Sequence, residues 1–283
     1  MDRNDTSLSI KQALKLASNI LLEVVQYPKK EALILLSYFL CKDEVWLFLH
    51  EDSKIKNSDG YFNLIKRRAN EEPIEYITKK VSFYSEEFFI DYGALIPRPE
   101  TELLVDEVIK LAKNFKKEIN ISEIGIGSGV ISIMLAKNIK NSKITATDTS
   151  IKAIEIAKKN IEKFRFLDKI KVFNSPYLDC IEEKIDIIVS NPPYVANDYE
   201  VEKPLHYEPK EAIFAGEEGD EILKNIIHVA KKKKVKYLAC EIGYNQKDSI
   251  SKMLNKLSFD EYYFYKDLSG FDRGFVAKGD CNV

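Results

Sequence analysis

The sequence predicts an α/β protein in which a mostly parallel sheet follows a small helical domain and a β-hairpin. Three observations support this fold class. Apolar residues recur at helical spacing up to about residue 70. Residues 77–92 are rich in aromatic and β-branched residues, and from residue 119 onward strand and helix patterns alternate. We therefore expect a helical domain at residues 1–75, a hairpin linker at 76–95 and an α/β domain at 96–283.

The N-terminal region begins with a clear helix-start signal. Ser9 and Gln12 have the spacing of a capping box, in which each side chain binds a free backbone N–H of the other residue. Further helices are expected at residues 29–40, 43–50 and 60–70. No residue pattern in this region is typical of a catalytic site.

The next segment predicts a hairpin and then a helix. Two runs, 77–83 and 88–92, have the composition of paired strands. Pro97 and Pro99 then stiffen the chain just before a helix that we expect at residues 100–115.

The remaining chain alternates strands and helices, which favours a largely parallel sheet with helices on both faces. The expected strands are residues 120–124, 143–147, 171–174, 185–190, 235–242, 262–266 and 271–278. The expected helices between them are residues 129–138, 151–163, 220–232 and 246–257.

The composition limits the function classes. The chain carries 43 Lys and Arg against 45 Asp and Glu, so its net charge of -2 predicts no long-range attraction to nucleic acid. Its cysteines form no C-x-x-C and its histidines have no ligand spacing, so we expect no metal site and a reducing compartment. These residues are Cys41, Cys180, Cys240, Cys281, His50, His206 and His228. The polar N-terminus and the lack of long apolar runs indicate a cytoplasmic protein without membrane contact.

A glycine-rich stretch lies between the first strand and the first helix of the α/β region. Gly125, Gly127 and Gly129 form G-x-G-x-G, which allows a tight turn and close approach of a ligand to the main chain. Val130 breaks the dinucleotide pattern G-x-G-x-x-G, and no Lys-Ser/Thr pair of a P-loop follows. The phosphate-binding patterns are therefore missing.

An acid ends the next strand. Asp148 is placed to accept hydrogen bonds from both ribose hydroxyls of an adenosine. Together with the glycine loop it favours a nucleoside cofactor without phosphates, and S-adenosylmethionine (SAM) fits that description. The alternative is a plain strand–helix turn followed by a helix-capping Asp.

The run Asn191-Pro192-Pro193-Tyr194 ends an apolar strand. Two prolines hold a backbone carbonyl in a rigid pose, and the asparagine side chain offers a second acceptor. Two acceptors and an aromatic ring suit a planar –NH2 group, whose lone pair can then be directed at a methyl group held by SAM. The alternative is a rigid turn after the strand. The –NH2 group could belong to a side-chain amide or to adenine, and the motif alone does not separate them.

With these motifs the sequence resembles the release factor glutamine methyltransferase family (the PrmC/HemK group). Asn-Pro-Pro-Tyr alone is shared with adenine-specific DNA methyltransferases, but its combination with R-P-E-T-E at 98–102 and Y-E-P at 207–209 is narrower. The resemblance extends over segments 67–77, 95–105, 123–129, 188–195, 207–223, 240–246 and 266–279.

The resemblance implies a Rossmann-like, SAM-dependent methyltransferase domain whose sheet ends in an antiparallel strand. It implies methylation of the side-chain amide nitrogen of the glutamine in the Gly-Gly-Gln motif of peptide chain release factors, with S-adenosylhomocysteine as the other product. It also implies that the N-terminal domain helps to hold the release factor. No direct DNA substrate is expected, and a monomer is favoured.

The resemblance also implies which residues form the site. The cofactor-binding residues would be Gly125, Ile126, Gly127, Ser128, Gly129, Asp148, Tyr177 and Asn191. The catalytic residues would be Asn191, Pro192, Pro193 and Tyr194.

Some positions depart from the family pattern or allow two interpretations. Tyr177 falls on the aromatic position beside the adenine, but Pro176 replaces the acid usually found before it, and Asp179 is the candidate substitute. Segment 98–102 forms a wall of the site or simply a helix N-terminus, although Arg98 could contact substrate. Segment 207–209 is a lid or a rigid loop.

Three other functions compete with this interpretation. A DNA adenine methyltransferase would need a basic surface, which the net charge and the acidic stretch 217–221 disfavour. An enzyme that methylates a glutamine of a ribosomal protein would share the fold and motif and would differ mainly in the N-terminal region. A SAM-binding module without catalysis would not need the intact Asn-Pro-Pro-Tyr run.

Overall fold

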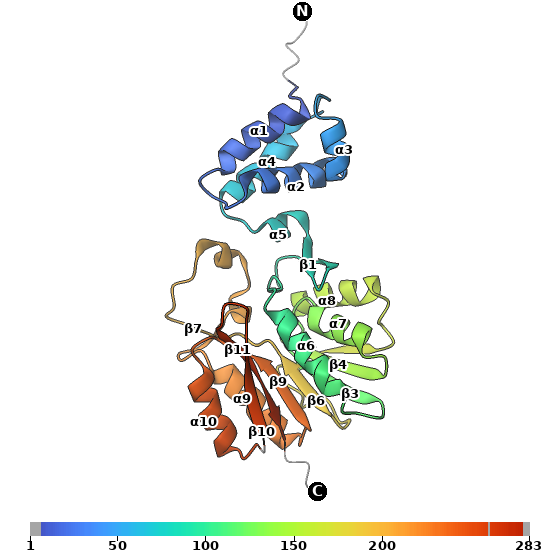
Figure 1. Cartoon of the computed structure of the whole chain (residues 1–283), viewed down its shortest axis with the longest axis vertical. Helices are drawn as coiled ribbons and strands as arrows, with labels where there is room; N and C mark the ends of the chain where they lie inside the picture. The colour runs from blue at the N-terminus through green and yellow to red at the C-terminus, as the bar shows by residue number, and fades with distance from the viewer. Residues whose placement is uncertain (1–6, 260, 280–283) are drawn as a thin grey trace, which may run out of the picture. The chain divides into compact units, whose positions relative to one another are not determined.

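The computed structural model describes residues 7–259 and 261–279, and Cys281 lies outside them. The chain forms two compact units, coloured in sequence order in Figure 1. The first comprises Met1–Lys79 with Glu202–Tyr207, and the second comprises Lys80–Val201 with Glu208–Val283. The functional division at residues 75 and 95 stays a prediction.

The first unit is a small helical domain. Its helices are α1 (Ile10–Leu21), α2 (Pro28–Leu40), α3 (Glu44–Leu49), α4 (Ser58–Ala69) and α5 (Ile74–Thr78). The capping box is confirmed, because Ser9 N donates to Gln12 Oε1 at 2.9 Å and Gln12 N donates to Ser9 Oγ at 3.2 Å. Buried apolar side chains from all five of these helices and the loop before α4 form its core, which includes Ala17, Leu36 and Ile65.

A short segment from later in the chain also belongs to the first unit. The 3₁₀ helix η1 (Lys203–Tyr207) ends in Tyr207, whose hydroxyl donates to the carbonyl of Asn70 at 2.9 Å. Lys203 pairs with Glu71 at 3.3 Å. The sequence patterns contained no sign of this association.

The second unit begins with the predicted hairpin, which is shorter than expected. Strands β1 (Lys80–Phe83) and β2 (Glu86–Phe89) pair antiparallel. The prediction that the first strand starts at Ile77 was wrong, because Ile77 lies in α5. The Thr78 hydroxyl donates back to the Ile74 carbonyl at 2.8 Å, and Lys79 ends the helix with a φ of 60°.

A seven-stranded sheet of order β10-β11-β9-β6-β3-β4-β5 forms the centre of the second unit (Figure 1). Five neighbouring strands run parallel to one another: β9, β6, β3, β4 and β5. Strand β11 is antiparallel to both of its neighbours, β9 and β10. The mostly parallel sheet with an antiparallel closing strand is therefore confirmed. The bounds are β3 (Ile119–Ile124), β4 (Ser142–Asp148), β5 (Ile170–Asn174), β6 (Ile187–Ser190), β9 (Tyr237–Glu241), β10 (Glu261–Lys266) and β11 (Asp272–Lys278). A separate two-stranded pair, β7 (Val195–Ala196) and β8 (Phe214–Gly216), lies in the loop region after β6, where the short 3₁₀ helix η2 (Lys210–Ala212) also lies.

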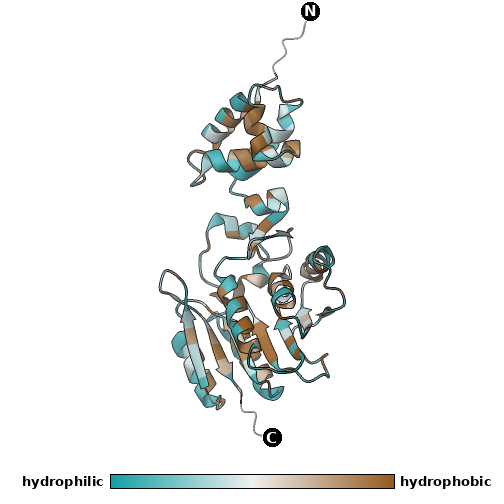
Figure 2. Ribbon diagram, turned by 45° about the vertical axis from the view of Figure 1, so that its right-hand side comes forward, coloured by the Kyte–Doolittle hydropathy of each residue, from teal (hydrophilic) through white to brown (hydrophobic). Residues whose placement is uncertain are grey.

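Helices cover both faces of this sheet. They are α6 (Thr101–Ala112), α7 (Val130–Asn138), α8 (Ile151–Lys163), α9 (Glu221–Lys232) and α10 (Lys247–Lys256). Helices α9 and α10 share a core with Ile188 and Leu238, so the alternating residues Ile187 and Val189 face the layer of α6, α7 and α8. The central strands are largely hydrophobic in Figure 2, as expected for strands buried on both faces.

No helix within the described residues is long and apolar enough to span a lipid bilayer. In the same part of the chain, no group of three or more His, Cys, Asp or Glu side chains is arranged to hold a metal ion.

Candidate active site

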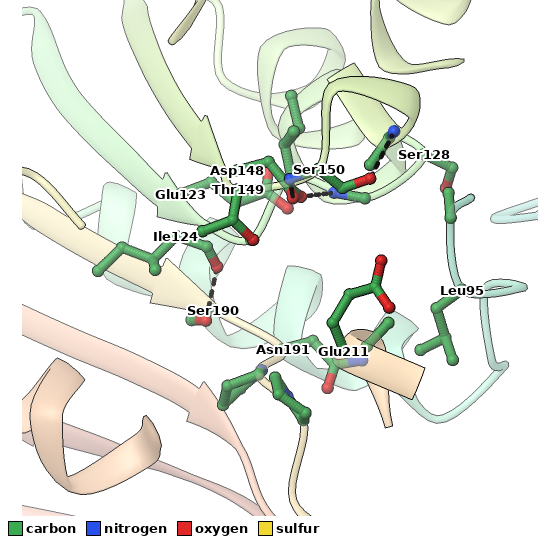
Figure 3. A pocket seen from close by; sticks show the side chains of 18 of the residues that line it. Leu95, Glu123, Ile124, Ser128, Asp148, Thr149, Ser150, Ser190, Asn191 and Glu211 are labelled. Atoms are coloured by element: carbon green, nitrogen blue, oxygen red, sulfur yellow. Dashed lines mark hydrogen bonds between the residues drawn. The ribbon is translucent and has the colours of Figure 1, made fainter. Parts of the chain in front are cut away.

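A cavity of about 260 Å³ lies in the second unit at the carboxyl ends of strands β3, β4 and β6. This is the edge of an open α/β sheet where ligands usually bind. Figure 3 shows side chains from all three strand ends facing this space. Its walls bring together segments that are distant in sequence, including Leu95, the glycine loop, Asp148, Asn191 and Glu211.

The glycine loop forms one wall through its backbone. Gly125 and Gly127 have φ values of 78° and 53°, and a Cβ atom at either position would meet no atom within 4 Å. The loop therefore presents bare main chain to open space, as a closely bound ligand requires. The predicted residues Gly125, Ile126, Gly127 and Ser128 all line the cavity.

Gly129 has a different role from the other predicted loop residues. It does not line the cavity but is the residue before the first turn of α7, with a φ of 86°. A Cβ atom there would lie 3.3 Å from the Cβ of Ala157 in α8. Gly129 thus allows close helix packing behind the loop, which the spacing alone did not distinguish from ligand contact.

A buried asparagine ties the glycine loop to the hairpin. Asn160 of α8 is completely buried, and its Nδ2 donates to the Ser128 carbonyl and to the Phe89 carbonyl, each at 2.8 Å. Its Oδ1 accepts from the Phe89 N–H at 2.8 Å. Both the nitrogen and the oxygen of this side chain are used to join the loop to the hairpin, and no sequence motif indicated it.

Asp148 lies where the sequence predicted it, at the end of β4 and in the cavity wall. Its carboxylate accepts from the backbone N–H of Gly127 at 2.9 Å and of Ser150 at 2.8 Å. Figure 3 shows Asp148 beside Ser150. Burial raises the pKa of this carboxyl above its usual value, although these backbone donors favour the charged form. Each oxygen keeps a lone pair, so Asp148 can still accept from a pair of hydroxyls.

Glu123 is a cavity residue that the sequence analysis did not single out. It precedes the glycine loop on β3 and is buried, and its carboxylate accepts from the N–H and the hydroxyl of Ser132. Burial raises the pKa of Glu123 to about 8. The available signal was an acid two residues before the first glycine of the loop, inside a predicted strand.

Strand β6 carries the Asn-Pro-Pro run into the same cavity. Ser190, at the end of the strand, donates from its hydroxyl to the Ile124 carbonyl at 2.6 Å and so joins β6 to β3 where the glycine loop begins (Figure 3). Asn191, Pro192 and Pro193 line the cavity, and their role as an –NH2 site stays a prediction.

Tyr194 is not among the residues that line the cavity. Its hydroxyl donates to Glu241 Oε1 at 3.4 Å, and its backbone carbonyl accepts from Gln246 Nε2 at 3.2 Å. In this structure Tyr194 therefore faces the sheet behind the cavity, where it helps to hold the Asn-Pro-Pro run.

A buried hydrogen-bonded chain lies behind Asn191. Asn191 Nδ2 donates to the Thr101 hydroxyl oxygen at 3.0 Å, and the Thr101 hydroxyl donates to Glu241 Oε2 at 2.7 Å. Burial raises the pKa of Glu241 to about 7. Glu241 was missed by the sequence analysis, and Thr101 was noted only as part of segment 98–102.

The remaining predicted residues divide between the cavity and its support. Tyr177 and Pro176 both line the cavity. Asp179 does not, and its carboxylate instead pairs with Lys232 at 3.0 Å on the surface, so it is not a substitute for the missing acid in this structure.

Arg98 is held by an internal ion pair. It pairs with the buried Glu208, whose other oxygen accepts from the Ile96 N–H at 2.9 Å. Glu102 accepts from the backbone N–H of Tyr84 at 2.6 Å. These two residues of segment 98–102 therefore make structural contacts, whereas Thr101 reaches the cavity wall.

Known proteins resemble this chain over nearly its whole length. Residues 12–78 match the PrmC N-terminal domain, and residues 99–208 match the methyltransferase small domain. A Clostridium acetobutylicum protein named release factor glutamine methyltransferase is 34% identical over 284 residues, which cover 95% of this chain and 98% of the relative. The chain belongs to the release factor glutamine methyltransferase family.

Other relatives extend the comparison. A second release factor glutamine methyltransferase, from Clostridium botulinum, is 36% identical and covers 88% of this chain and 91% of the relative. A Rickettsia conorii protein named bifunctional methyltransferase is 34% identical over 94% of this chain, but the chain spans only 57% of that longer protein.

Solved structures confirm the Rossmann-like methyltransferase fold. The catalytic domain of hMettl16 in complex with MAT2A 3'UTR hairpin 6 aligns with a TM-score of 0.56 at 21% identity, covering 68% of this chain and 75% of that one. The N-terminal domain of human METTL16 in complex with SAH aligns with a TM-score of 0.51 at 19% identity, with the same coverage. At this identity the likeness shows the fold alone.

Proposed function

We propose that the protein transfers the methyl group of SAM to the side-chain amide nitrogen of the glutamine in the Gly-Gly-Gln motif of peptide chain release factors. One observation carries the proposal: a bare glycine loop, an acid and an Asn-Pro-Pro run line the same cavity. The near full-length similarity to proteins named for this activity selects the substrate class.

The residues present suit an adenosine-type cofactor. The open space beside Gly125 and Gly127 admits a ligand against the main chain. Asp148 has free acceptor sites for the ribose hydroxyls, and Tyr177 offers an aromatic face for the adenine. When bound there, SAM supplies an electrophilic methyl group on a positive sulfonium.

The Asn-Pro-Pro run suits an amide nitrogen. An amide is a weak nucleophile because its lone pair is conjugated with the carbonyl. We propose that Asn191 Oδ1 and a backbone carbonyl of the proline pair accept its two hydrogens, so that the nitrogen is held with its lone pair toward the methyl group. The nitrogen–carbon bond forms as the carbon–sulfur bond breaks, the sulfur keeps the bonding electrons, and the nitrogen releases one proton to water.

The partner is then a protein. A net charge of -2 supports a protein substrate over DNA. We propose that the N-terminal unit helps to bind the release factor, that the enzyme acts as a monomer, and that it works in the cytoplasm, where translation ends.

The test is methyl transfer from labelled SAM to three acceptors: an intact release factor, the same factor with its Gly-Gly-Gln glutamine replaced by alanine, and unmethylated duplex DNA. Label on the intact factor alone supports the proposal. Label on DNA alone would mean that the site holds adenine. Label on none of them, with SAM bound, would direct the search to a ribosomal-protein glutamine or to a non-catalytic role.

The Asn191→Ala variant tests the site itself. We expect methyl transfer to fall at least about 100-fold, because the variant loses an acceptor needed to position the nitrogen. SAM affinity, measured by calorimetry, should stay close to that of the unmodified protein. Full turnover by this variant would contradict the assignment of Asn191.

A further inference from the structure

We propose that Thr101 and Glu241 are positioning residues that fix which way the Asn191 side-chain amide faces. They would hold its nitrogen toward the protein and leave its oxygen free for the substrate amide. The inference rests on the proposed function, because it assigns the oxygen a substrate to bind.

The geometry begins with three polar side chains that meet at the edge of the sheet. Asn191 follows β6, Thr101 is the first residue of α6, and Glu241 ends β9. Thr101 and Glu241 are each only 2% exposed, so water does not compete for their hydrogen bonds. The chain runs from Asn191 Nδ2 to Thr101 Oγ1 at 3.0 Å, and from there to Glu241 Oε2 at 2.7 Å.

The chemistry of these groups fixes which atom donates and which accepts in each of the two hydrogen bonds. While Glu241 is ionised, its carboxylate has no hydrogen and can only accept, so the single hydrogen of the Thr101 hydroxyl is used by Glu241. Toward Asn191 the same hydroxyl oxygen can then only accept. The –NH2 end of the Asn191 amide must therefore face Thr101.

Rotating the amide by half a turn would be unfavourable on both sides. The Asn191 oxygen would face the buried Thr101 oxygen, which has no hydrogen left to give, so two acceptors would be opposed. Its –NH2 group would face the cavity and meet the –NH2 group of a substrate amide. The hydrogen bonds through Thr101 to Glu241 thus select the one amide orientation in which Asn191 can accept a hydrogen bond from the substrate.

Glu241 is itself held in place from a second side. The Tyr194 hydroxyl donates to its other oxygen, Oε1, at 3.4 Å. Tyr194 does not line the cavity, and its role in the Asn-Pro-Pro-Tyr run is therefore to hold Glu241. Tyr194, the fourth residue of the Asn-Pro-Pro-Tyr run, is thus connected to Asn191, the first, through Glu241 and Thr101.

The main test is the pair Thr101→Val and Thr101→Ser. Valine keeps the shape of the side chain and removes the hydroxyl, so we expect kcat to fall about 10- to 100-fold while the Kd for SAM is unchanged. Serine keeps the hydroxyl and should restore kcat to within about threefold of the unmodified protein. Ser142→Ala is the matched control. It removes a buried hydroxyl, bonded to the Ile139 carbonyl at 2.8 Å, from the opposite end of β4.

A second readout does not depend on turnover. In protein labelled with ¹⁵N-asparagine, the Asn191 side-chain NH2 signal is assigned by its loss in Asn191→Ala. We expect slow solvent exchange of one of its hydrogens in the unmodified protein and fast exchange in Thr101→Val. If the unmodified protein methylates no release factor, the proposed function fails, while the exchange rates still decide the role of Thr101.

The outcomes separate cleanly. Slow exchange and normal kcat in Thr101→Val would overturn the proposal, as would a loss of kcat in Ser142→Ala equal to that in Thr101→Val. If Thr101→Val does not fold, Glu241→Gln takes its place. A glutamine amide can donate as well as accept, so the direction of the chain is no longer imposed and the exchange protection at Asn191 should fall. Unchanged protection in Glu241→Gln would also count against the proposal.

Discussion

At the scale of single residues, the protonation of buried carboxyl groups governs what the cavity can do. Glu241 can impose a direction on its neighbours only while it is ionised, and burial raises its pKa to about 7. A protonated Glu241 could donate to Thr101 and so allow the hydroxyl to turn toward Asn191. The same low-dielectric surroundings that make the hydrogen bonds strong therefore make the site sensitive to pH.

This sensitivity gives a pH prediction. We expect kcat at saturating SAM to be highest above pH 7 and to decrease as the pH falls through about 7, because the raised pKa lets Glu241 take up a proton there. Glu241→Gln should remove this step, since its side chain does not titrate. The titratable, charged or polar groups that face Glu241 are Thr101, Glu100, Tyr194, Tyr265 and Arg273.

The pH dependence of kcat, recorded for both proteins over a range that brackets the raised pKa of about 7, provides the measurement. A kcat that stays constant down to pH 6 in the unmodified protein would contradict the prediction. So would an identical decrease in Glu241→Gln, because another group would then be responsible.

At the scale of elements, the glycine loop has two separate functions: one part faces the cavity and the next part packs against a helix. Gly125 and Gly129 have similar positive φ values, 78° and 86°, so the backbone strain of a side chain is matched at the two positions. Their surroundings differ. A Cβ atom at Gly125 would project into open cavity space, whereas one at Gly129 would press on Ala157 of α8.

The matched substitutions Gly125→Ala and Gly129→Ala should therefore separate binding from stability. Both should lose about 1 kcal/mol of unfolding free energy from the positive φ. Gly125→Ala should also weaken SAM binding about tenfold or more, because its methyl group occupies the ligand face. Gly129→Ala should lose more stability than its partner and keep more of its SAM affinity. Urea unfolding and calorimetry measure the two quantities, and equal effects on both would refute the division.

At the scale of the whole molecule, the cavity lies entirely within the second unit. Every residue that lines it falls in Lys80–Val201 or Glu208–Val283. The first unit has its own hydrophobic core and includes segment 202–207, which it contacts through Tyr207 and Lys203. The proposed function would then place cofactor binding in the second unit and part of the protein-substrate binding in the first.

A truncation tests that assignment. A protein that starts at Lys80 should bind SAM with a Kd within about threefold of the full chain, because the ligand-facing groups remain. Its methylation of an intact release factor should fall far more, since the proposed partner contacts are lost. Calorimetry and labelled methyl transfer measure the two effects. Full release-factor activity in the truncated protein would show that the first unit is not needed for the substrate.

The sequence by itself determined the features that depend on local patterns. The alternation of strands and helices, the capping box at Ser9, the glycine loop, Asp148 and the rigid Asn-Pro-Pro run all follow from the conformational limits of a few adjacent residues. Even there the local pattern failed at Ile77, where a helical turn closed by its own hydrogen bonds replaced the expected strand. It also placed the second hairpin strand at 88–92, whereas β2 spans Glu86–Phe89.

Only the tertiary structure decided which polar residues meet. Glu241 and Thr101 are 140 positions apart, and Thr101 and Asn191 are 90 apart, so no local spacing could connect them. Buried polar groups must find partners, and the parallel order of β9, β6 and β3 brings their carboxyl ends to one edge where those partners are available. That is why the structure alone shows which end of the Asn191 amide faces the cavity.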